Sequence, residues 1–298
     1  MPKIILITCM ILLFGKFLIA QSNSGGSTPA SDSSALQSIA SHNLKKTDNR
    51  GKFYFYWGYN GSAFTHSDIH FAGPDYDFTF FDVKAHDRPS HFSAGLYLNP
   101  ATISIPQYNY RLGYHFTDRW SISLGQDHMK YVVDQNQTVL MSGFIDDAVS
   151  TAYHGVYVDS AIILSEDFLK FEHTDGLNLV SLDLEYTLPL LSLPDGKMNV
   201  SFSTGIGLAC MIPRTDVRVF GEGINNKFHL AGYSISAKAG PRIEFFHNFF
   251  LLAQVRTGYI NLPDILLNNS SPQRADQHFS FLEYFVAAGF TFPFHKNH

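Results

Sequence analysis

Three residues near the first strand-like segment have the side chains and the spacing of a metal site. His66, Asp68 and His70 are each separated by one residue. In an extended strand, residues at i, i+2 and i+4 project from the same face, so these side chains would lie within reach of one ion. Imidazole nitrogens and carboxylate oxygens are common ligands of zinc. The spacing predicts a divalent-cation site and no other cofactor. The alternative is a solvated strand, because the chain has 14 histidines.

Asp127, His128 and Lys130 form a second group with chemical potential. An acid and a base beside a nucleophile could support a hydrolase or an acyltransferase. Asp127 and His128 are adjacent, however, and adjacent residues of a strand point to opposite faces unless a bulge intervenes. No serine nucleophile can be assigned to them by spacing. A polar cluster without catalytic activity is therefore the alternative interpretation.

A third set of ionisable residues lies within segments that alternate between polar and apolar residues. Its members all occupy the polar face, with four cations and four anions. They are Arg111, Lys238, Arg242, Arg256, Asp183, Glu185, Glu244 and Glu283. Charges on a shared inner face are expected to pair, because an unpaired buried charge is costly.

The first residues indicate export from the cytoplasm. An apolar run at 4–19, too short for a membrane-spanning helix, is followed by Ala20 and a polar stretch, which predicts a signal peptide at 1–20. Residues 21–50 are rich in Ser, Gly, Asn and Asp and are expected to form a flexible periplasmic leader. Cys210 alone remains after cleavage, which excludes an intramolecular disulfide. A net charge of -5 without a basic stripe argues against nucleic acid as a partner.

The rest of the chain carries the two-residue period of β-strands. Aromatic residues make up 15% of the chain and charged residues only 16%, which fits strands with apolar exteriors. The alternating segments are 53–60, 108–116, 120–125, 180–188, 200–209, 233–245, 251–259 and 282–294.

Short and long connections alternate between these segments. The turns at 117–118, 193–196 and 247–248 are short, whereas 61–103, 133–177, 213–228 and 261–278 are long. Short periplasmic turns and long extracellular loops are typical of an outer-membrane barrel. Residues 51–298 are therefore predicted to form an all-β, transmembrane, antiparallel up-and-down β-barrel of eight strands with both termini periplasmic. The strand-like run at 76–83 is assigned to a hairpin beyond the membrane, and ten strands are the alternative.

From Lys52 onward, this layout resembles the small outer-membrane barrels of the OmpA, OmpX and OmpW type. The last strand is rich in alternating aromatics, similar to the signal that the barrel-assembly machinery reads in such proteins. Phe294 is followed by four more residues, whereas many family members end at the Phe. The resemblance implies assembly by that machinery and contact with outer-membrane lipids and lipopolysaccharide. It does not supply a function.

An eight-stranded barrel is just wide enough for side chains to fill it, so the eight inward charges predict a plugged lumen. Function is then expected outside the membrane. The segment 133–177 combines acids with aromatics, and long loops on rigid scaffolds often carry binding. We expect a non-enzymatic surface or structural barrel that binds an extracellular protein or glycan. The alternative is a lipid A-modifying hydrolase or acyltransferase at the barrel rim.

Overall fold

The structure is a computed structural model that describes residues 48–193, 197–224, 227–268 and 272–293. The predicted signal peptide and nearly all of the predicted leader lie outside the described residues, as does the chain after Pro293.

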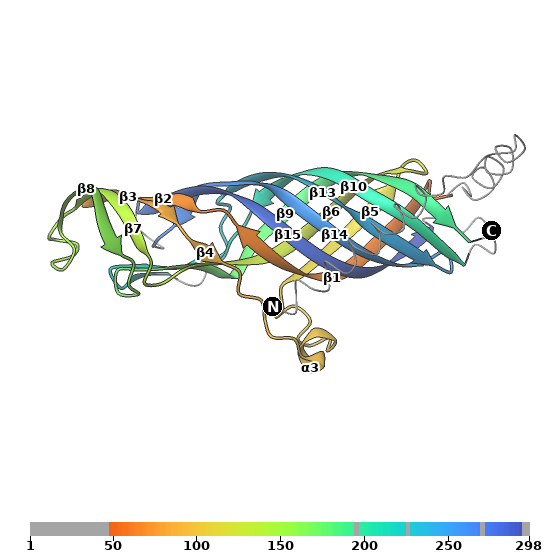
Figure 1. The fold of residues 1–298 in the computed structure, drawn as a ribbon, viewed down its shortest axis with the longest axis horizontal. Helices are drawn as coiled ribbons and strands as arrows, with labels where there is room; N and C mark the ends of the chain where they lie inside the picture. Colours follow the sequence, from red (N-terminus) through yellow and green to blue (C-terminus); the bar gives the residue numbers. More distant parts are fainter. Residues whose placement is uncertain (1–47, 194–196, 225–226, 269–271, 294–298) are drawn as a thin grey trace, which may run out of the picture. The chain divides into compact units, whose positions relative to one another are not determined.

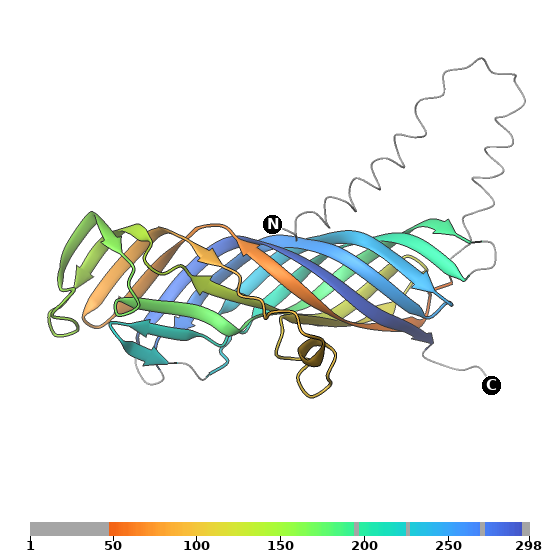
Figure 2. The same ribbon diagram turned by 60° about the horizontal axis from the view of Figure 1, so that its bottom comes forward.

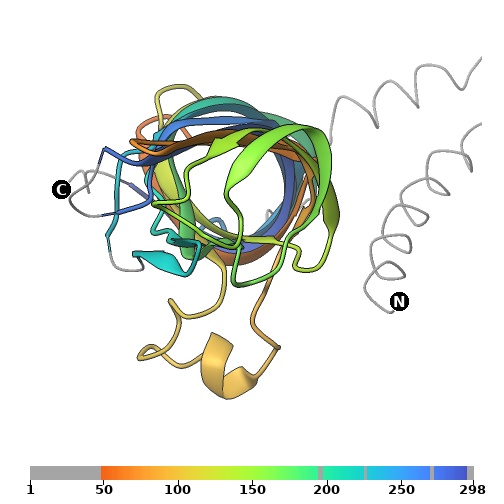
Figure 3. The same cartoon turned by 90° about the vertical axis from the view of Figure 1, so that its left-hand side faces the viewer.

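Eight strands form a closed antiparallel ring, in which each strand pairs with the next and the last pairs with the first. Figure 3 shows this ring end-on. The strands are β1 (Lys52–Phe64), β5 (Tyr108–His115), β6 (Trp120–Val133), β9 (Leu169–Ser192), β10 (Met198–Met211), β13 (Gly232–Phe245), β14 (Phe249–Leu266) and β15 (Arg274–Pro293). The predicted antiparallel barrel is confirmed, and the count of eight holds in place of ten.

Alternation along the strands produces the two faces of the wall. On β15, Glu283 and Phe285 are buried inside the ring, whereas Leu282, Tyr284 and Val286 are exposed on its outer surface. Burial alternates in the same way along β10 and β13. An exposed apolar outer wall around a polar lumen is the pattern expected of a barrel in lipid.

Aromatic side chains gather at both margins of this outer wall. Near the short turns, Phe53 packs against Tyr114 and Phe292, and Trp120 packs against Tyr186. Four residues further along β1, Trp57 stacks on Tyr108 and Tyr110. Tyr59 on β1 and Tyr259 on β14 lie towards the opposite margin. From Phe249 to Tyr259, β14 rises about 33 Å at ~3.3 Å per residue, or about 25 Å along a barrel axis tilted by roughly 40° from the strand. On β14, the distance between the level of Phe249 (the first girdle) and the level of Tyr259 (the second girdle) therefore matches a hydrocarbon layer.

Beyond the second girdle, part of the wall continues as a sheet of its own. We call the strands β2 (Ser67–Gly73), β3 (Tyr76–Val83), β7 (Thr138–Ile145) and β8 (Gly155–Ile163) the distal sheet. They follow β15 in the order β2, β3, β7, β8, at the left of Figures 1 and 2. The run at 76–83 is therefore a hairpin strand outside the ring, as predicted.

Smaller elements complete the distal end. The strand β11 (Asp216–Val219) joins β9 to β12 (Glu222–Ile224), and β4 (Ala85–His86) pairs with β6. A loop with the short helix α3 (Ala94–Tyr97) projects from the side of the barrel in Figure 3, where Tyr97 packs on Tyr59. No helix among the described residues has the length and apolar character needed to cross a membrane.

An apolar core fills the distal end of the barrel, under the distal sheet. It includes Phe71, Phe78 and Phe80 from β2 and β3, and Phe168 and Phe171 from the segment 133–177. The long connections are thus mostly strands, and two of the aromatics expected on the surface are buried. The strand-like runs within these connections are short. Their sequence alone does not indicate that they pack together over the open end of the barrel.

Candidate functional site

Six of the eight charged residues predicted to face inward gather in one part of the lumen, together with Asp127. Arg111 on β5 donates from Nη1 to Asp183 at 2.5 Å and from Nη2 to Asp127 at 3.0 Å. Arg256 on β14 donates to the same two carboxylates, at 2.5 Å to Asp127 and 2.8 Å to Asp183. All four side chains are at most 1% exposed. Two guanidinium groups therefore clamp two carboxylates across the lumen.

Lys238 extends this cluster along the barrel. Its ammonium group lies 2.8 Å from Asp183 and 2.8 Å from Glu185. Glu185 also accepts a hydrogen bond from Ser123. The buried charges in the lumen are thus paired with opposite charges and hydrogen-bonded to serine hydroxyls, as buried charges require.

Glu283 belongs to the same level but is bonded differently. It is paired in register with Arg256 and is 0% exposed, yet neither carboxylate oxygen has a hydrogen-bond partner among the described residues. We call Arg111, Asp127, Asp183, Glu185, Lys238, Arg256 and Glu283 the lumen cluster.

Arg242 and Glu244 do not join the lumen cluster. They form their own pair at 3.3 Å near the short turns. Arg242 also donates to Thr291 at 2.9 Å and lies 3.7 Å from the centre of the Phe250 ring. The predicted set of eight charges is therefore divided into two groups at two heights.

The lumen cluster is closed off on both sides. Towards the short turns, Tyr54, Tyr56, Phe250 and Phe285 form a buried aromatic cluster. Towards the other end lies the distal apolar core. An eight-stranded barrel has little internal space, and in the described part of the chain the lumen cluster thus lies between two layers of buried apolar side chains.

Asp127 was predicted to form a polar cluster at the barrel rim with His128 and Lys130, but the structure separates it from these two residues. Asp127 points into the lumen and is 0% exposed, whereas His128 lies on the opposite face. The Nδ1 atom of His128 is 2.9 Å from Asn178 Oδ1, and its ring stacks on Tyr108. Burial lowers the pKa of Lys130, whose Nζ reaches the carbonyl of Ile105. The three residues thus form no common cluster.

Asp127 could have been recognised as a member of the lumen cluster. It has the same parity as Ser121, Ser123 and Gly125, which occupy the polar face of β6. This alternation predicts the face on which Asp127 lies. Its adjacency to His128 does not indicate a shared site, because adjacent residues of a strand point to opposite faces.

The predicted metal residues share a face but not a ligand site. His66 pairs with Asp82 at 2.8 Å, and Asp68 accepts a hydrogen bond from the Asp82 amide at 2.9 Å. His70 bridges Asp276 and Asp77, at 2.7 and 3.1 Å. Within the described residues, no group of three or more His, Cys, Asp or Glu side chains is arranged to hold a metal ion. Each histidine has an aspartate partner of its own, so the predicted triplet does not converge.

The two aspartates change the acidity of His70. Its partial burial by itself lowers the pKa, but the hydrogen bonds and charges of Asp276 and Asp77 outweigh this effect and raise it. A protonated His70 would link β15, β2 and β3 through two charge-assisted hydrogen bonds.

The outer face of the distal sheet carries exposed apolar side chains that the sequence did not single out. Cross-strand pairing places Phe81 beside Leu140, and Phe144 beside Val156. Val156 and Val158 on β8 are 82% and 78% exposed. We call the exposed residues Leu140, Phe144, Val156, Val158 and Ile163, together with the half-buried Phe81, the distal apolar patch. In the described residues no strand pairs with the outer edge of β8.

Comparisons with known proteins find no sequence family, and they find distant likenesses to solved outer-membrane barrels. No family model and no curated protein matches the chain. The solved structure of the outer membrane protein OprG from Pseudomonas aeruginosa is 10% identical, with a TM-score of 0.37, over 83% of this chain and 99% of that one. Neisserial surface protein A is 10% identical at a TM-score of 0.32, covering 82% of this chain and 98% of that one. Ail from Yersinia pestis is 9% identical at a TM-score of 0.32, covering 82% and 99%.

The closed ring of eight hydrogen-bonded strands confirms the expected barrel architecture. All three TM-scores lie below 0.5, so these likenesses establish no shared function. The barrel assignment rests on the closed ring of hydrogen-bonded strands.

Proposed function

We propose that the chain is a bacterial outer-membrane barrel with periplasmic termini, a closed lumen and a distal sheet that binds a protein partner outside the cell. The membrane placement is supported by the exposed apolar wall, by the two aromatic girdles and by the short turns gathered at one end. Assembly by the barrel-assembly machinery and contact with lipopolysaccharide remain predictions.

A closed lumen directs the function towards the surface. The lumen cluster lies between two apolar layers, so transport of a solute would require breaking several buried ion pairs. Removing one partner of such a pair typically costs about 3–5 kcal/mol. Recognition outside the membrane needs no such opening.

The distal apolar patch is the observation that carries the proposal. Large apolar side chains at the tip of a rigid sheet have no covering element among the described residues. Contiguous exposed apolar surface commonly marks a protein interface. The unpaired edge of β8 adds backbone donors and acceptors that an extended segment of a partner could use.

Cysteine labelling on intact cells tests the orientation. The free Cys210 is exposed on the outer wall, so the experiment starts from a Cys210→Ser background. A membrane-impermeant maleimide should label Val158→Cys, whereas His247→Cys, in a short turn, should react only after lysis. Labelling of His247→Cys on intact cells and not of Val158→Cys would reverse the orientation.

Binding is then tested with cells exposed to an array of purified extracellular proteins. The double variant Val156→Asp, Val158→Asp places two charges in the distal apolar patch and should lose an interaction that the wild type makes. Val255→Asp is unsuitable as a control because it faces lipid. Asp147→Asn changes an exposed residue outside the patch and should bind like the wild type. Equal array profiles for all three proteins would contradict the proposal.

The rim-enzyme alternative has less support. Its predicted acid, Asp127, is committed to two arginines in the lumen, and His128 is engaged by Asn178. We retain it as a second hypothesis because lipid A analysis tests it directly.

A further inference from the structure

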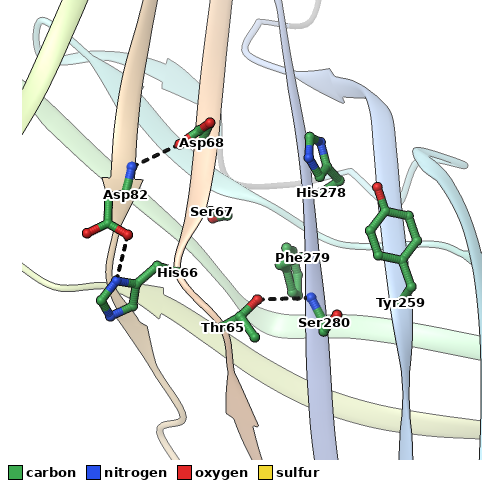
Figure 4. Close-up of a pocket in the computed structure, with 9 residues that line it drawn as sticks. All are labelled: Thr65, His66, Ser67, Asp68, Asp82, Tyr259, His278, Phe279 and Ser280. Atoms are coloured by element: carbon green, nitrogen blue, oxygen red, sulfur yellow. Dashed lines mark hydrogen bonds and ion pairs between the residues drawn. The ribbon is translucent and has the colours of Figure 1, made fainter. Parts of the chain in front are cut away.

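The ring and the distal sheet meet at a break in the strand ladder. Pairing between β1 and β15 ends at Phe64 and Phe281, and pairing between β2 and β15 resumes at Ile69 and Gln277. Four residues on one side therefore oppose three on the other, which is the count of a bulge. Thr65 makes two hydrogen bonds with Ser280 at this break: its amide donates to the Ser280 carbonyl at 3.0 Å, and its Oγ1 accepts from the Ser280 amide at 3.0 Å. A cavity of about 260 Å³ opens at this break (Figure 4).

One wall of this junction cavity carries carboxylates and an imidazole. A second irregularity, between β2 and β3, puts Asp82 in the left-handed region with φ of 56°. The backbone amide of Asp82 donates to Asp68 Oδ1 at 2.9 Å, and its carboxylate pairs with His66 Nδ1 at 2.8 Å. Both contacts hold an uncommon backbone conformation and fix the three polar groups relative to one another, as Figure 4 shows.

The other wall is aromatic. Tyr259 on β14 and His278 on β15 lie with ring centroids 5.9 Å apart at 42°. Both side chains line the cavity from the side opposite Asp82 and His66 (Figure 4).

Several polar atoms of the cavity have no protein partner among the described residues. They are the second oxygens of Asp68 and Asp82, Nε2 of His66, the hydroxyl of Tyr259 and the imidazole nitrogens of His278. Acceptors and donors are thus both available to a ligand. Among the described residues that line the cavity there is no lysine or arginine, so its two carboxylates disfavour a bare phosphate.

The cavity adjoins the upper end of the apolar wall. On β15 the outward-facing residues change from the apolar Leu282 and Tyr284 to the polar Ser280 and His278 over a few residues. Tyr259 is an outward aromatic of the second girdle on β14. If this girdle marks the membrane surface, the cavity opens at the level of lipid headgroups.

We propose that the junction cavity binds one pyranose ring of a glycolipid headgroup in the membrane leaflet that surrounds the barrel. The Tyr259 ring offers a face for the sugar C–H groups, while Asp68, Asp82 and His66 offer hydrogen-bond partners for its hydroxyls. A volume of about 260 Å³ is just below the roughly 300–1,000 Å³ of sites for drug-sized ligands, which fits a single ring. The proposal goes beyond the extracellular partner and relies only on the membrane placement.

Four variants separate the roles of the walls. Tyr259→Ala removes the aromatic face, Tyr259→Phe keeps it, and Asp68→Ala removes an acceptor. Tyr233→Ala is the matched control, because Tyr233 is an outward, 56% exposed tyrosine on the neighbouring strand and does not line the cavity. Far-UV circular dichroism of each detergent-purified protein verifies the barrel.

Free sugars test the cavity without a membrane. Saturation-transfer NMR with methyl β-glucopyranoside and with N-acetylglucosamine should give ring-proton signals for the wild type, Tyr259→Phe and Tyr233→Ala. The signals should fall about tenfold, the ratio that about 1.4 kcal/mol produces, in Tyr259→Ala and Asp68→Ala. Signals that do not differ between these two variants and the control would overturn the proposal.

Lipids test the source of the sugar. In nanodiscs that contain both lipid A and phosphatidylglycerol, native mass spectrometry should detect lipid A retained by the wild type and by Tyr233→Ala, and about tenfold less by Tyr259→Ala. Binding of free sugar without enrichment of lipid A would overturn the headgroup assignment. Retention that EDTA abolishes and that Tyr259→Ala leaves unchanged would identify a cation bridge and also overturn it. Neither result depends on the distal apolar patch, so this proposal and the proposed function fail separately.

Discussion

Arg256 on β14 and Asp127 on β6 form an ion pair across the lumen, with 2.5 Å between Nη1 and Oδ2. In the ring order, these two strands are separated by three strands on either side, so the pair joins opposite walls. Arg111 reaches the same Asp127 oxygen from β5 at 3.0 Å. A contact between opposite walls both closes the lumen and ties together strands that share no backbone hydrogen bond.

Replacement of Asp127 by Ala should strongly destabilise the barrel. It leaves Arg111 and Arg256 with an incomplete set of counter-charges in a fully buried site, and breaking a buried pair in this way typically costs about 3–5 kcal/mol. The measurement is urea unfolding of the protein in liposomes, followed by fluorescence of Trp57 and Trp120. Glu244→Gln, at the less buried Arg242 pair, is the control and should cost less, because Arg242 keeps its hydrogen bond to Thr291 and its contact with the Phe250 ring. Equal losses for the two variants would remove the special role of the cross-lumen pair.

The wild type should not form large, stable channels. The lumen cluster is enclosed by the aromatic cluster on one side and by the distal apolar core on the other. Planar-bilayer recordings at neutral pH should show no stable large openings, whereas Arg111→Ala combined with Phe250→Ala should increase the frequency of transient ones. Steady large conductance in the wild type would contradict the closed lumen.

Stability should decrease on acidification because of His173, which lies beyond the second girdle in the distal core. Burial lowers the pKa of His173 to about 3. Its Nδ1 atom is bonded to Thr215 at 2.8 Å, and Nε2 has no partner among the described residues. Between about pH 6.5 and pH 3, the unfolded chain binds a proton at this histidine and the folded chain does not, so the free energy of unfolding falls as pH falls.

The test compares the pH dependence of unfolding with and without His173→Gln. His70 acts in the opposite direction, because its raised pKa gives stability below about pH 6.5 that is lost as pH rises through the folded value. Both proteins should therefore carry His70→Gln. The slope between pH 6.5 and pH 4 should be shallower in the protein that also carries His173→Gln, and identical slopes would show that His173 is protonated in the folded state.

Lipid A should be chemically unchanged by this protein. Asp127 is part of the lumen cluster and is separated from His128, so the predicted rim residues do not form an acid and base pair. Mass spectrometry of lipid A from cells with and without the gene should give the same acyl pattern. A loss or gain of acyl chains that disappears in His128→Ala would instead support the rim enzyme.

Alternation was sufficient to predict most of the barrel. The two-residue period gave the eight ring strands and the inward direction of Arg111, Asp183 and Arg256, because a strand fixes the face of every residue by parity. Alternating connection lengths gave the antiparallel order. The same parity predicts that Asp127 faces inward, with Ser121, Ser123 and Gly125.

The two-residue period and the connection lengths could not predict contacts between distant segments. Parity gives the face of a residue and not its height, so it could not separate Arg242 and Glu244 from the lumen cluster. Likewise, His66, Asp68 and His70 do share a face. His66, however, is hydrogen-bonded to Asp82 and His70 to Asp276, and both aspartates belong to other strands.

The sequence by itself therefore determined the inner and outer faces and the charged and aromatic content of each face, and it favoured eight strands over ten. These properties depend on residues one or two positions apart. Only the tertiary structure decided that the long connections form a cored distal sheet, that an ion pair joins opposite walls, and that a cavity opens between β2, β14 and β15. These features depend on strand register and on bulges between segments up to about 200 residues apart, for example the 206 positions between His70 and Asp276, and local periodicity contains no information about such distances.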